Sequence, residues 1–278
     1  MPPTQHMTFK AAPGGKLRGD VRVSGDKSIS HRSIMLGALS DGITRVSGFL
    51  EGDDCLATLG AFRAMGVNIE GPDQGRLTIH GVGMRGLREP AAPLNLGNSG
   101  TSMRLLSGLF AGQAFDVEMI GDASLTRRPM KRVTGPLTQM GAHIEASATG
   151  TPPLKITGGH SLHGIDYVMP VASAQVKSSL LLAGMYASGM TCVTEPAPTR
   201  DHTERMMRGF GYKVECHGNR VCLQGGGSLH ATDIDVPADI SSAAFFIFFP
   251  EGFFFPHPDS NNEIKTSFIY NITPIFYW

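Results

Sequence analysis

The segment SGDKSISHR, residues 24–32, places a lysine and an arginine among glycine and serine residues just before an apolar run. Glycine and serine let a backbone approach a ligand closely, and the free N–H groups at a helix N-terminus attract anions. Lys27, Ser28 and Arg32 are therefore candidates for binding a phosphate or a carboxylate. A Walker A loop ending at Lys27 would need glycines where this chain has valine and aspartate, which disfavours a nucleoside triphosphate.

Two further loops, GNSGTSMR and VASAQVKSS, have a similar composition and also precede apolar runs. Two arginines stand at the entrances of other predicted helices, Arg128 before Pro129 and Arg200 before Asp201. Asp201 with Glu204 predicts a capping box, which leaves Arg200 outside the helix. Serine and threonine also cap ordinary helices, and a lone arginine is usually solvated. The equivalent positions of these loops and arginines, rather than any one of them, indicate an anion site.

These loops recur because the chain repeats itself. Segments at Met65, Met140 and Phe210 each read as a helix end, a glycine and a strand. Around them the order strand, helix, strand, helix, strand, strand occurs three times between about residues 19 and 227, and a fourth unit opens at Asp233. The sequence thus predicts an α/β domain of three βαβαββ repeats. The alternative is an α/β chain whose helices merely tend to end in glycine.

The positions of glycines and the spacing of apolar residues predict where the helices of each unit lie. Gly66, Gly141 and Gly211 suit the left-handed position that closes a helix. Each unit has a first helix after its small-residue loop and a second helix before its closing glycine. The expected first helices are 30–39, 100–112 and 174–189, and the expected second helices are 53–65, 128–140 and 200–210.

Composition narrows the classes of function. The 278 residues are 41% hydrophobic, which suffices for a core, and 24 basic residues balance 24 acidic ones. We expect neither nucleic acid nor membrane as a partner, because there is no net charge and no apolar run reaches the roughly 20 residues of a membrane span. The N-terminus lacks a secretion signal, and the four cysteines follow no metal-ligand spacing. We therefore expect a cytoplasmic protein with reduced thiols and no metal.

Five motifs together resemble those of the 3-phosphoshikimate 1-carboxyvinyltransferase (EPSP synthase) family of enolpyruvyl transferases. They follow the order of the family over residues 17–246, and as a set they are highly specific. They are DKSISHR, GNSGTSMRLL, LTRRPM, PVASAQVKSSLLLAG and EPAPTRDHTERM. The forms ASAQVKS and TRDHTE are similar to the branch that includes glyphosate-tolerant bacterial enzymes.

The resemblance implies an inside-out α/β barrel fold of two similar domains, each made of three βαβαββ units. Residues 19–231 would form one whole domain with half of the active site, and residues 1–18 with 232–246 would be the remnant of a truncated second domain. Residues 247–278 match nothing in the family, and nine of the fifteen phenylalanines lie between Phe245 and Phe276. We expect a non-homologous end from a frameshift, a premature stop or a mis-assembled gene; a lineage-specific ending is the alternative.

The implied reaction moves the enolpyruvyl group of phosphoenolpyruvate onto the 5-hydroxyl of shikimate 3-phosphate and releases phosphate, without a cofactor. This is a step of the shikimate pathway of aromatic amino-acid biosynthesis, and the family implies a monomer. Without the acid and base groups of a second domain we expect weak anion binding and little turnover. The alternatives are a non-catalytic anion-binding domain or an inert gene fragment. UDP-N-acetylglucosamine enolpyruvyl transferase is a further alternative, disfavoured by the lysine-serine pair at 27–28 and by SAQ at 173–175.

Carried over residue by residue, the resemblance implies two sets of contacts. Shikimate 3-phosphate would be bound by Lys27, Ser28, Arg32, Ser173, Ala174, Gln175 and Arg200. Phosphoenolpyruvate would be bound by Lys27, Gly100, Thr101, Arg128 and Gln175. Lys27, between the two substrates, is the catalytic candidate. Ala174 stands where many relatives have a second serine, and Gly100 leaves room that a methyl group would fill, which predicts glyphosate sensitivity.

Overall fold

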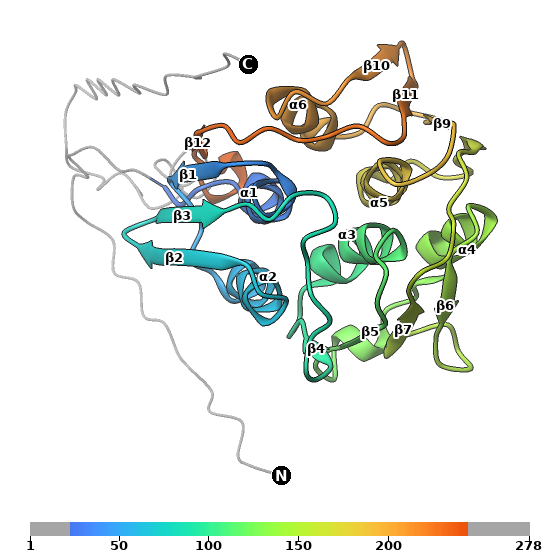
Figure 1. Ribbon diagram of the computed structural model, residues 1–278, viewed down its shortest axis with the longest axis horizontal. Coiled ribbons are helices and arrows are strands. Elements are labelled where there is room, and N and C mark those ends of the chain that lie inside the picture. The colour runs from blue at the N-terminus through green and yellow to red at the C-terminus, as the bar shows by residue number, and fades with distance from the viewer. Residues whose placement is uncertain (1–22, 244–278) are drawn as a thin grey trace, which may run out of the picture. The chain divides into compact units, whose positions relative to one another are not determined.

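The computed structural model describes residues 23–243 of the chain. It divides into two compact units, and every helix and strand given below lies in the unit Gly25–Pro237 (Figure 1). The expected remnant at 1–18, the first strand expected near residue 20 and the tail 247–278 lie outside the described residues.

Three four-stranded sheets share one pattern, in which a parallel edge pair is followed by two antiparallel pairings. The first sheet has the order β12 (Ile234–Asp235), β1 (Ile43–Ser47), β3 (Arg76–His80), β2 (Asn68–Asp73). The second has the order β4 (Leu94–Asn95), β5 (Val117–Ile120), β7 (Leu154–Thr157), β6 (His143–Glu145). The third has the order β8 (Asp166–Val168), β9 (Met190–Thr194), β11 (Arg220–Gln224), β10 (Val214–His217).

Two helices accompany each sheet. The first helices are α1 (Lys27–Leu39), α3 (Gly100–Ala111) and α5 (Ala174–Gly184). The second helices are α2 (Asp53–Ala64), α4 (Lys131–Gln139) and α6 (His202–Gly209), and the short 3-10 helix η1 (Leu125–Arg127) precedes α4. Gly66, Gly141 and Gly211 have positive φ just after the second helices, as the sequence predicts.

The first helices form the core. Every residue of α1 from Ser30 to Leu39 is buried, and α3 is buried along almost its whole length. A helix that is buried on every side has no polar stripe facing solvent, which explains why these segments show little amphipathic patterning. Figure 1 shows α3 and α5 side by side, with the strands of the sheets outside the helices.

The packing of α3 on α5 depends on Gly108. A Cβ atom at this position would lie 2.0 Å from the carbonyl oxygen of Ser179 on α5. Only a residue without a side chain allows the two helix backbones to approach this closely.

The strand predicted to open a fourth unit at Asp233 lies in the first sheet. β12 pairs in parallel with β1, with Val46 opposite Ile234 and Ser47 opposite Asp235. The first sheet therefore takes its parallel edge strand from the far end of the compact unit. A pattern of local elements cannot reveal this, because both possible edge strands read alike.

The prediction of four reduced cysteines is wrong for one pair. Cys192 and Cys222 lie opposite one another in the register of β9 and β11 and are joined by a disulfide. Opposed residues on antiparallel strands have close Cβ atoms, so the pairing follows from register rather than from spacing along the chain. Cys55 is buried and Cys216 is exposed, both as free thiols.

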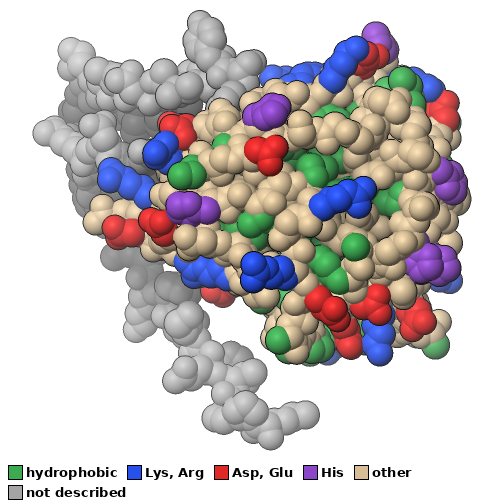
Figure 2. All heavy atoms as spheres, in the orientation of Figure 1, with side chains coloured by type: hydrophobic (Ala, Val, Ile, Leu, Met, Phe, Trp, Pro, Cys, Tyr) green, Lys and Arg blue, Asp and Glu red, His purple; other side chains and the backbone are tan. Residues whose placement is uncertain are grey.

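The surface of the described residues carries charges of both signs. Figure 2 shows basic and acidic side chains scattered over the face in view. Between residues 23 and 243, no helix has the length and apolar character needed to cross a membrane.

We predict that Gly108→Ala lowers the free energy of unfolding by about 3 kcal/mol, because the new methyl group meets a backbone oxygen that cannot move aside. Urea denaturation of the full chain measures the change. Gly60→Ala is the matched control: Gly60 lies inside α2 with no atom within 4 Å of its added Cβ. This control should stabilise the chain by about 0.5–1 kcal/mol, and equal effects of the two variants would contradict the packing argument.

Candidate anion-binding site

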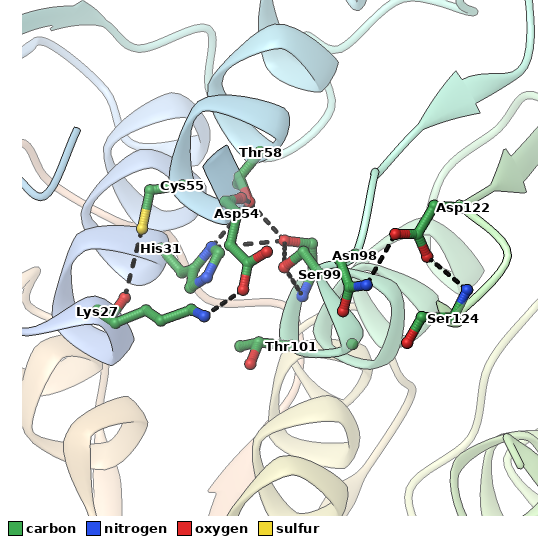
Figure 3. A network of polar contacts seen from close by, with 12 residues as sticks. Lys27, His31, Asp54, Cys55, Thr58, Asn98, Ser99, Thr101, Asp122 and Ser124 are labelled. Atoms are coloured by element: carbon green, nitrogen blue, oxygen red, sulfur yellow. Dashed lines mark hydrogen bonds and ion pairs between the residues drawn. The ribbon is translucent and has the colours of Figure 1, made fainter. Parts of the chain in front are cut away.

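The first group of predicted residues lies at the start of α1. Asp26 caps the helix, with its Oδ1 accepting the N–H of Ile29 at 2.8 Å. Lys27 is exposed, and its Nζ forms an ion pair with the carboxylate of Asp54 at the start of α2 (Figure 3). The pair holds an ammonium group at the N-terminal ends of two helices, where it can meet an anion.

Arg32 joins three helices. Its side chain is buried, and its Nε donates to Thr203 Oγ1 on α6 at 2.6 Å. Nη2 donates to Ser178 Oγ on α5 at 2.8 Å, and Nη1 donates to the carbonyl oxygen of Ser28 at 2.9 Å. These bonds engage three of the five N–H groups of a guanidinium, and the remaining two can bind a carboxylate.

Arg200 lies outside α6, as predicted, and is exposed. Burial lowers the pKa of Arg32 to about 10, and repulsion from Arg200 adds to this lowering while Glu204 and Asp26 oppose it. Arg32 therefore stays charged at neutral pH. Among the described residues no acidic side chain forms an ion pair with Arg200. Two neighbouring cations of this kind attract an anion.

The predicted capping box at the start of α6 is wrong. Asp201 forms no capping hydrogen bond; its carboxylate instead accepts from Arg205 Nε at 2.7 Å. Glu204 turns inward to the ammonium of Lys177, 2.6 Å away. An inward partner outweighs the local cap because a buried lysine needs a carboxylate.

The predicted start of the second helix at Arg128 is also wrong. Arg128 has extended backbone at the end of η1, and α4 begins only at Lys131. Arg128 Nη2 donates to Asn98 Oδ1 in the loop before α3 and to Ser124 Oγ just before η1.

Two guanidinium groups converge at Gly100. A Cβ atom on Gly100 would lie 2.8 Å from Nη1 of Arg128 and 2.9 Å from Nη1 of Arg104. Burial lowers the pKa of Arg104 to about 10, and repulsion from Arg132 and Arg128 lowers it further. The predicted residues Gly100 and Arg128 are thus brought together, and they share their place with a cation that sequence reasoning missed.

The acceptors of these two guanidinium groups are neutral. Arg104 Nη1 donates to Gln175 Oε1 at 2.9 Å and to the carbonyl oxygen of Gly100 at 3.2 Å. Asn98, the acceptor of Arg128, donates from its Nδ2 to Asp122 Oδ2 at 2.7 Å (Figure 3). Backbone hydrogen bonds lower the pKa of Asp122, and the charge of Arg128 contributes to this lowering. No acidic side chain in the part of the chain that is described forms an ion pair with Arg104 or Arg128. Neither guanidinium is thus paired directly with a carboxylate of the described residues, so both can attract a bound anion.

Gln175 connects the second and third loops. Its Nε2 donates to Thr101 Oγ1 on α3 at 3.1 Å, in addition to the bond from Arg104. Ser173 caps α5, its Oγ accepting the N–H of Val176 at 3.4 Å, and Ala174 is the first residue of the helix. Thr101 and Gln175 thus meet, as the prediction requires.

A buried chain of hydrogen bonds joins α1, α2 and α3. His31 Nδ1 lies 2.8 Å from Thr58 Oγ1, which lies 2.6 Å from Ser102 Oγ, and this oxygen lies 2.6 Å from Ser99 Oγ (Figure 3). Burial lowers the pKa of His31 to about 3, and Arg32 lowers it further, so the imidazole is neutral at ordinary pH.

Sequence reasoning missed the residues that hold the predicted ones in place. Arg104 could have been found, since it follows Gly100 by one helical turn in the same motif. His31 and Thr58 gave no such signal, because a polar residue on a buried helix face has no visible partner in a single sequence. Within residues 23–243 no cluster of three or more His, Cys, Asp or Glu residues could hold a metal ion.

The fold is that of an α/β protein with cationic side chains gathered at helix N-termini, an arrangement suited to small anions. A sequence profile of the EPSP synthase (3-phosphoshikimate 1-carboxyvinyltransferase) family matches residues 11–250, and the chain belongs to this family. The resemblance expected over 17–246 is thereby confirmed.

Similar proteins and structures agree with this membership. A 3-phosphoshikimate 1-carboxyvinyltransferase of Methylococcus capsulatus is 72% identical over 241 residues, covering 87% of this chain and 55% of that protein. One from Nitrosococcus oceani is 69% identical, with 87% and 54% covered. The EPSP synthase structure from Acinetobacter baumannii superposes with a TM-score of 0.82 at 62% identity, covering 84% of this chain and 53% of that one. The α/β EPSP synthase fold is thus confirmed, and the chain spans about half the length of these relatives.

We predict that His31 makes the stability of the chain depend on pH. The pKa of a histidine rises from about 3 in the folded chain to about 6.5 on unfolding, so the unfolded state takes up a proton between these values. The stabilising contribution is present above about pH 6.5 and is lost as pH falls, by about 1.4 kcal/mol per pH unit.

Urea denaturation of the wild type and of His31→Gln between pH 4 and 7 measures this contribution as the difference between the two slopes. His163→Gln is the control, because His163 is exposed and forms no ion pair among the described residues, and it should leave the slope much less changed than His31→Gln. Parallel curves for the wild type and His31→Gln would contradict a buried neutral imidazole.

Proposed function

We propose that this chain takes part in the transfer of the enolpyruvyl group of phosphoenolpyruvate to the 5-hydroxyl of shikimate 3-phosphate, giving 5-enolpyruvylshikimate 3-phosphate and phosphate. The observation that carries the proposal is the convergence of Arg104 and Arg128 at Gly100 with neutral partners only. Both substrates are anions, so orienting them requires cations whose charge is not already neutralised. Membership of the EPSP synthase family supports this choice of anions.

We assign shikimate 3-phosphate to the loops of α1 and α5. Ser28 and Arg32 bind its carboxylate, and two N–H groups of the Arg32 guanidinium suit a bidentate contact. Ser173 and Arg200 bind its phosphate, and the exposed position of Arg200 next to Arg32 supports this role. Ala174, the first residue of α5, contributes its backbone N–H but no hydroxyl.

We assign phosphoenolpyruvate to the loop of α3. Gly100, Thr101 and Arg128 contact it, and Gln175 bridges the two substrates because it bonds to both Thr101 and Arg104. Lys27 lies between the substrates as the catalytic residue, and its ion pair with Asp54 supports this placement at the helix N-termini.

The domain organisation is also a proposal. The three sheets of equal order support three βαβαββ repeats between residues 19 and 231, and the compact unit Gly25–Pro237 supports one domain that holds half of the active site. A second domain would contain 1–18 and most of 232–246, with β12 on the side of the first domain. We propose a monomer. Its cytoplasmic location is likewise a proposal, and in that location the disulfide Cys192–Cys222 would be unusual, because reducing compartments rarely keep disulfides.

A second candidate function is anion binding without turnover. The chain spans about half the length of the relatives that it matches, so about half of each relative has no counterpart in the matched region. In this alternative the same side chains bind shikimate 3-phosphate, and no phosphate is released from phosphoenolpyruvate.

Phosphate release from the two substrates together tests the proposed function. We predict that the purified full chain releases phosphate about tenfold or more faster than Lys27→Ala, since a charge-assisted contact contributes about 1.5–3 kcal/mol. Lys213→Ala is the matched control, because Lys213 forms an exposed ion pair with Glu215 away from the site. Binding of shikimate 3-phosphate with no phosphate release would favour the second candidate, and no binding would overturn both.

We further predict that Gly100→Ala weakens the binding of phosphoenolpyruvate and of glyphosate by about tenfold. The added methyl group displaces the ends of Arg104 and Arg128, which are flexible, so the chain stays folded while two anion contacts shift. Calorimetric titration of the chain saturated with shikimate 3-phosphate measures both affinities. Gly135→Ala on α4, where an added Cβ meets nothing within 4 Å, is the control. Unchanged affinities in Gly100→Ala would remove Gly100 from the site.

A further inference from the structure

A buried ion cluster lies behind the anion site, outside the residues that the proposed function uses. The Nζ atom of Lys177 on α5 lies 2.7 Å from Glu195 Oε1 and 2.6 Å from Glu204 Oε1. The three side chains are only 1%, 7% and 1% exposed. A buried ammonium and two buried carboxylates are costly to desolvate, and the ion pairs between them offset part of this cost. Oε2 of Glu204 has no hydrogen-bond partner among the described residues, so Glu204 depends on its ion pair with Lys177.

The two carboxylates stand at the ends of the segment that carries Arg200. Glu195 directly follows β9, and its backbone is fixed by hydrogen bonds to Asn219 in both directions. Glu204 lies in the first turn of α6. Between them, Thr199 donates its hydroxyl to the second carboxylate oxygen of Glu195. Lys177 thus closes the segment 195–204 by contacting both of its ends.

The same segment supplies a partner of Arg32. Thr203 accepts the bond from Arg32 Nε and donates to Ser178 Oγ at 2.7 Å, one residue beyond Lys177 on α5. A shift of the segment would therefore move Arg200 and change the contacts of the buried guanidinium at the same time.

The charges of the cluster matter as well as its geometry. Burial alone would lower the pKa of Lys177, but its hydrogen bonds to Glu195 and Glu204 raise it above the ordinary value, so the lysine is charged. Glu204 is also close enough to Arg32 to raise the pKa of that guanidinium. Without the ammonium of Lys177, the carboxylates of Glu195 and Glu204 would be attracted to Arg32 and Arg200 and would offset part of their positive charge.

We propose that Lys177 is a positioning residue of the anion site: it closes the segment 195–204 and offsets one of the two negative charges of Glu195 and Glu204, which leaves more of the charge of Arg32 and Arg200 for the ligand. The identity of the ligand as shikimate 3-phosphate rests on the proposed function, whereas the closure of the segment 195–204 by Lys177 is independent of it.

The test compares the full chain with Lys177→Met and with the uncharged variant Lys177→Met/Glu195→Gln/Glu204→Gln. In Lys177→Met the amides of 196–204 exchange about tenfold or more faster in deuterated water, while those of α3 do not change. Shikimate 3-phosphate binds about tenfold or more weakly by calorimetry. The uncharged variant keeps hydrogen-bonding side chains and removes the unpaired charges, so it recovers protection and affinity to within about threefold of the wild type.

Arg220→Met is the matched control, because it removes one cation from an exposed ion pair with Asp166. Both residues lie in the sheet that contains β9, the strand just before Glu195. Wild-type exchange or wild-type affinity in Lys177→Met overturns the proposal. An uncharged variant as weak as Lys177→Met overturns the charge argument, since only shape and packing would then matter. If the wild type itself does not bind shikimate 3-phosphate, the proposed function fails, and the exchange of 196–204 still decides the role of Lys177.

Discussion

Arg32, Ser102 and Ser178 are buried polar side chains near the N-terminal ends of α1, α3 and α5, so they must find hydrogen-bond partners within the protein. A hydrogen bond joins each pair of these helices, and the three bonds form a closed set. They join Arg32 with Ser178, Gln175 with Thr101, and His31 with Ser102. The cations of the site either take part in these hydrogen bonds or lie beside the residues that do. The site therefore depends on the relative positions of three helix ends, and no single loop contains it.

The buried cations of this fold have two kinds of partner, which are carboxylates for a lysine and neutral acceptors for the arginines. The ammonium of Lys177 is a compact charge, and its burial comes with two carboxylates. The guanidinium groups of Arg32 and Arg104 are buried with carbonyl, amide and hydroxyl acceptors instead. A delocalised charge is more weakly hydrated and can be held by neutral acceptors, which leaves its attraction for an anion intact. Neutralised and available cations therefore lie within one set of helices.

Much of the fold follows from local sequence signals. Glycines with positive φ after the second helices, such as Gly66, mark the ends of units, and continuous apolar runs mark the buried first helices. The failures occurred where a distant partner decided the local structure. Lys177 took Glu204 away from a capping role, and strand register joined Cys192 to Cys222. The loops of the site were predictable as helix entrances, whereas the cross-helix partners of Arg104 and His31 depend on packing that a single sequence does not display.

The pairing of β1 with β12 has a consequence for synthesis. Ser47 and Asp235 are 188 positions apart, so the ribosome has made nearly all of the compact unit before this edge of β1 gains its partner. Until then an exposed strand edge is open to pairing with other chains. Closing so long a loop is also slow, because the entropy of the intervening chain is lost before the contact forms. The first sheet to leave the ribosome is thus the last to be completed.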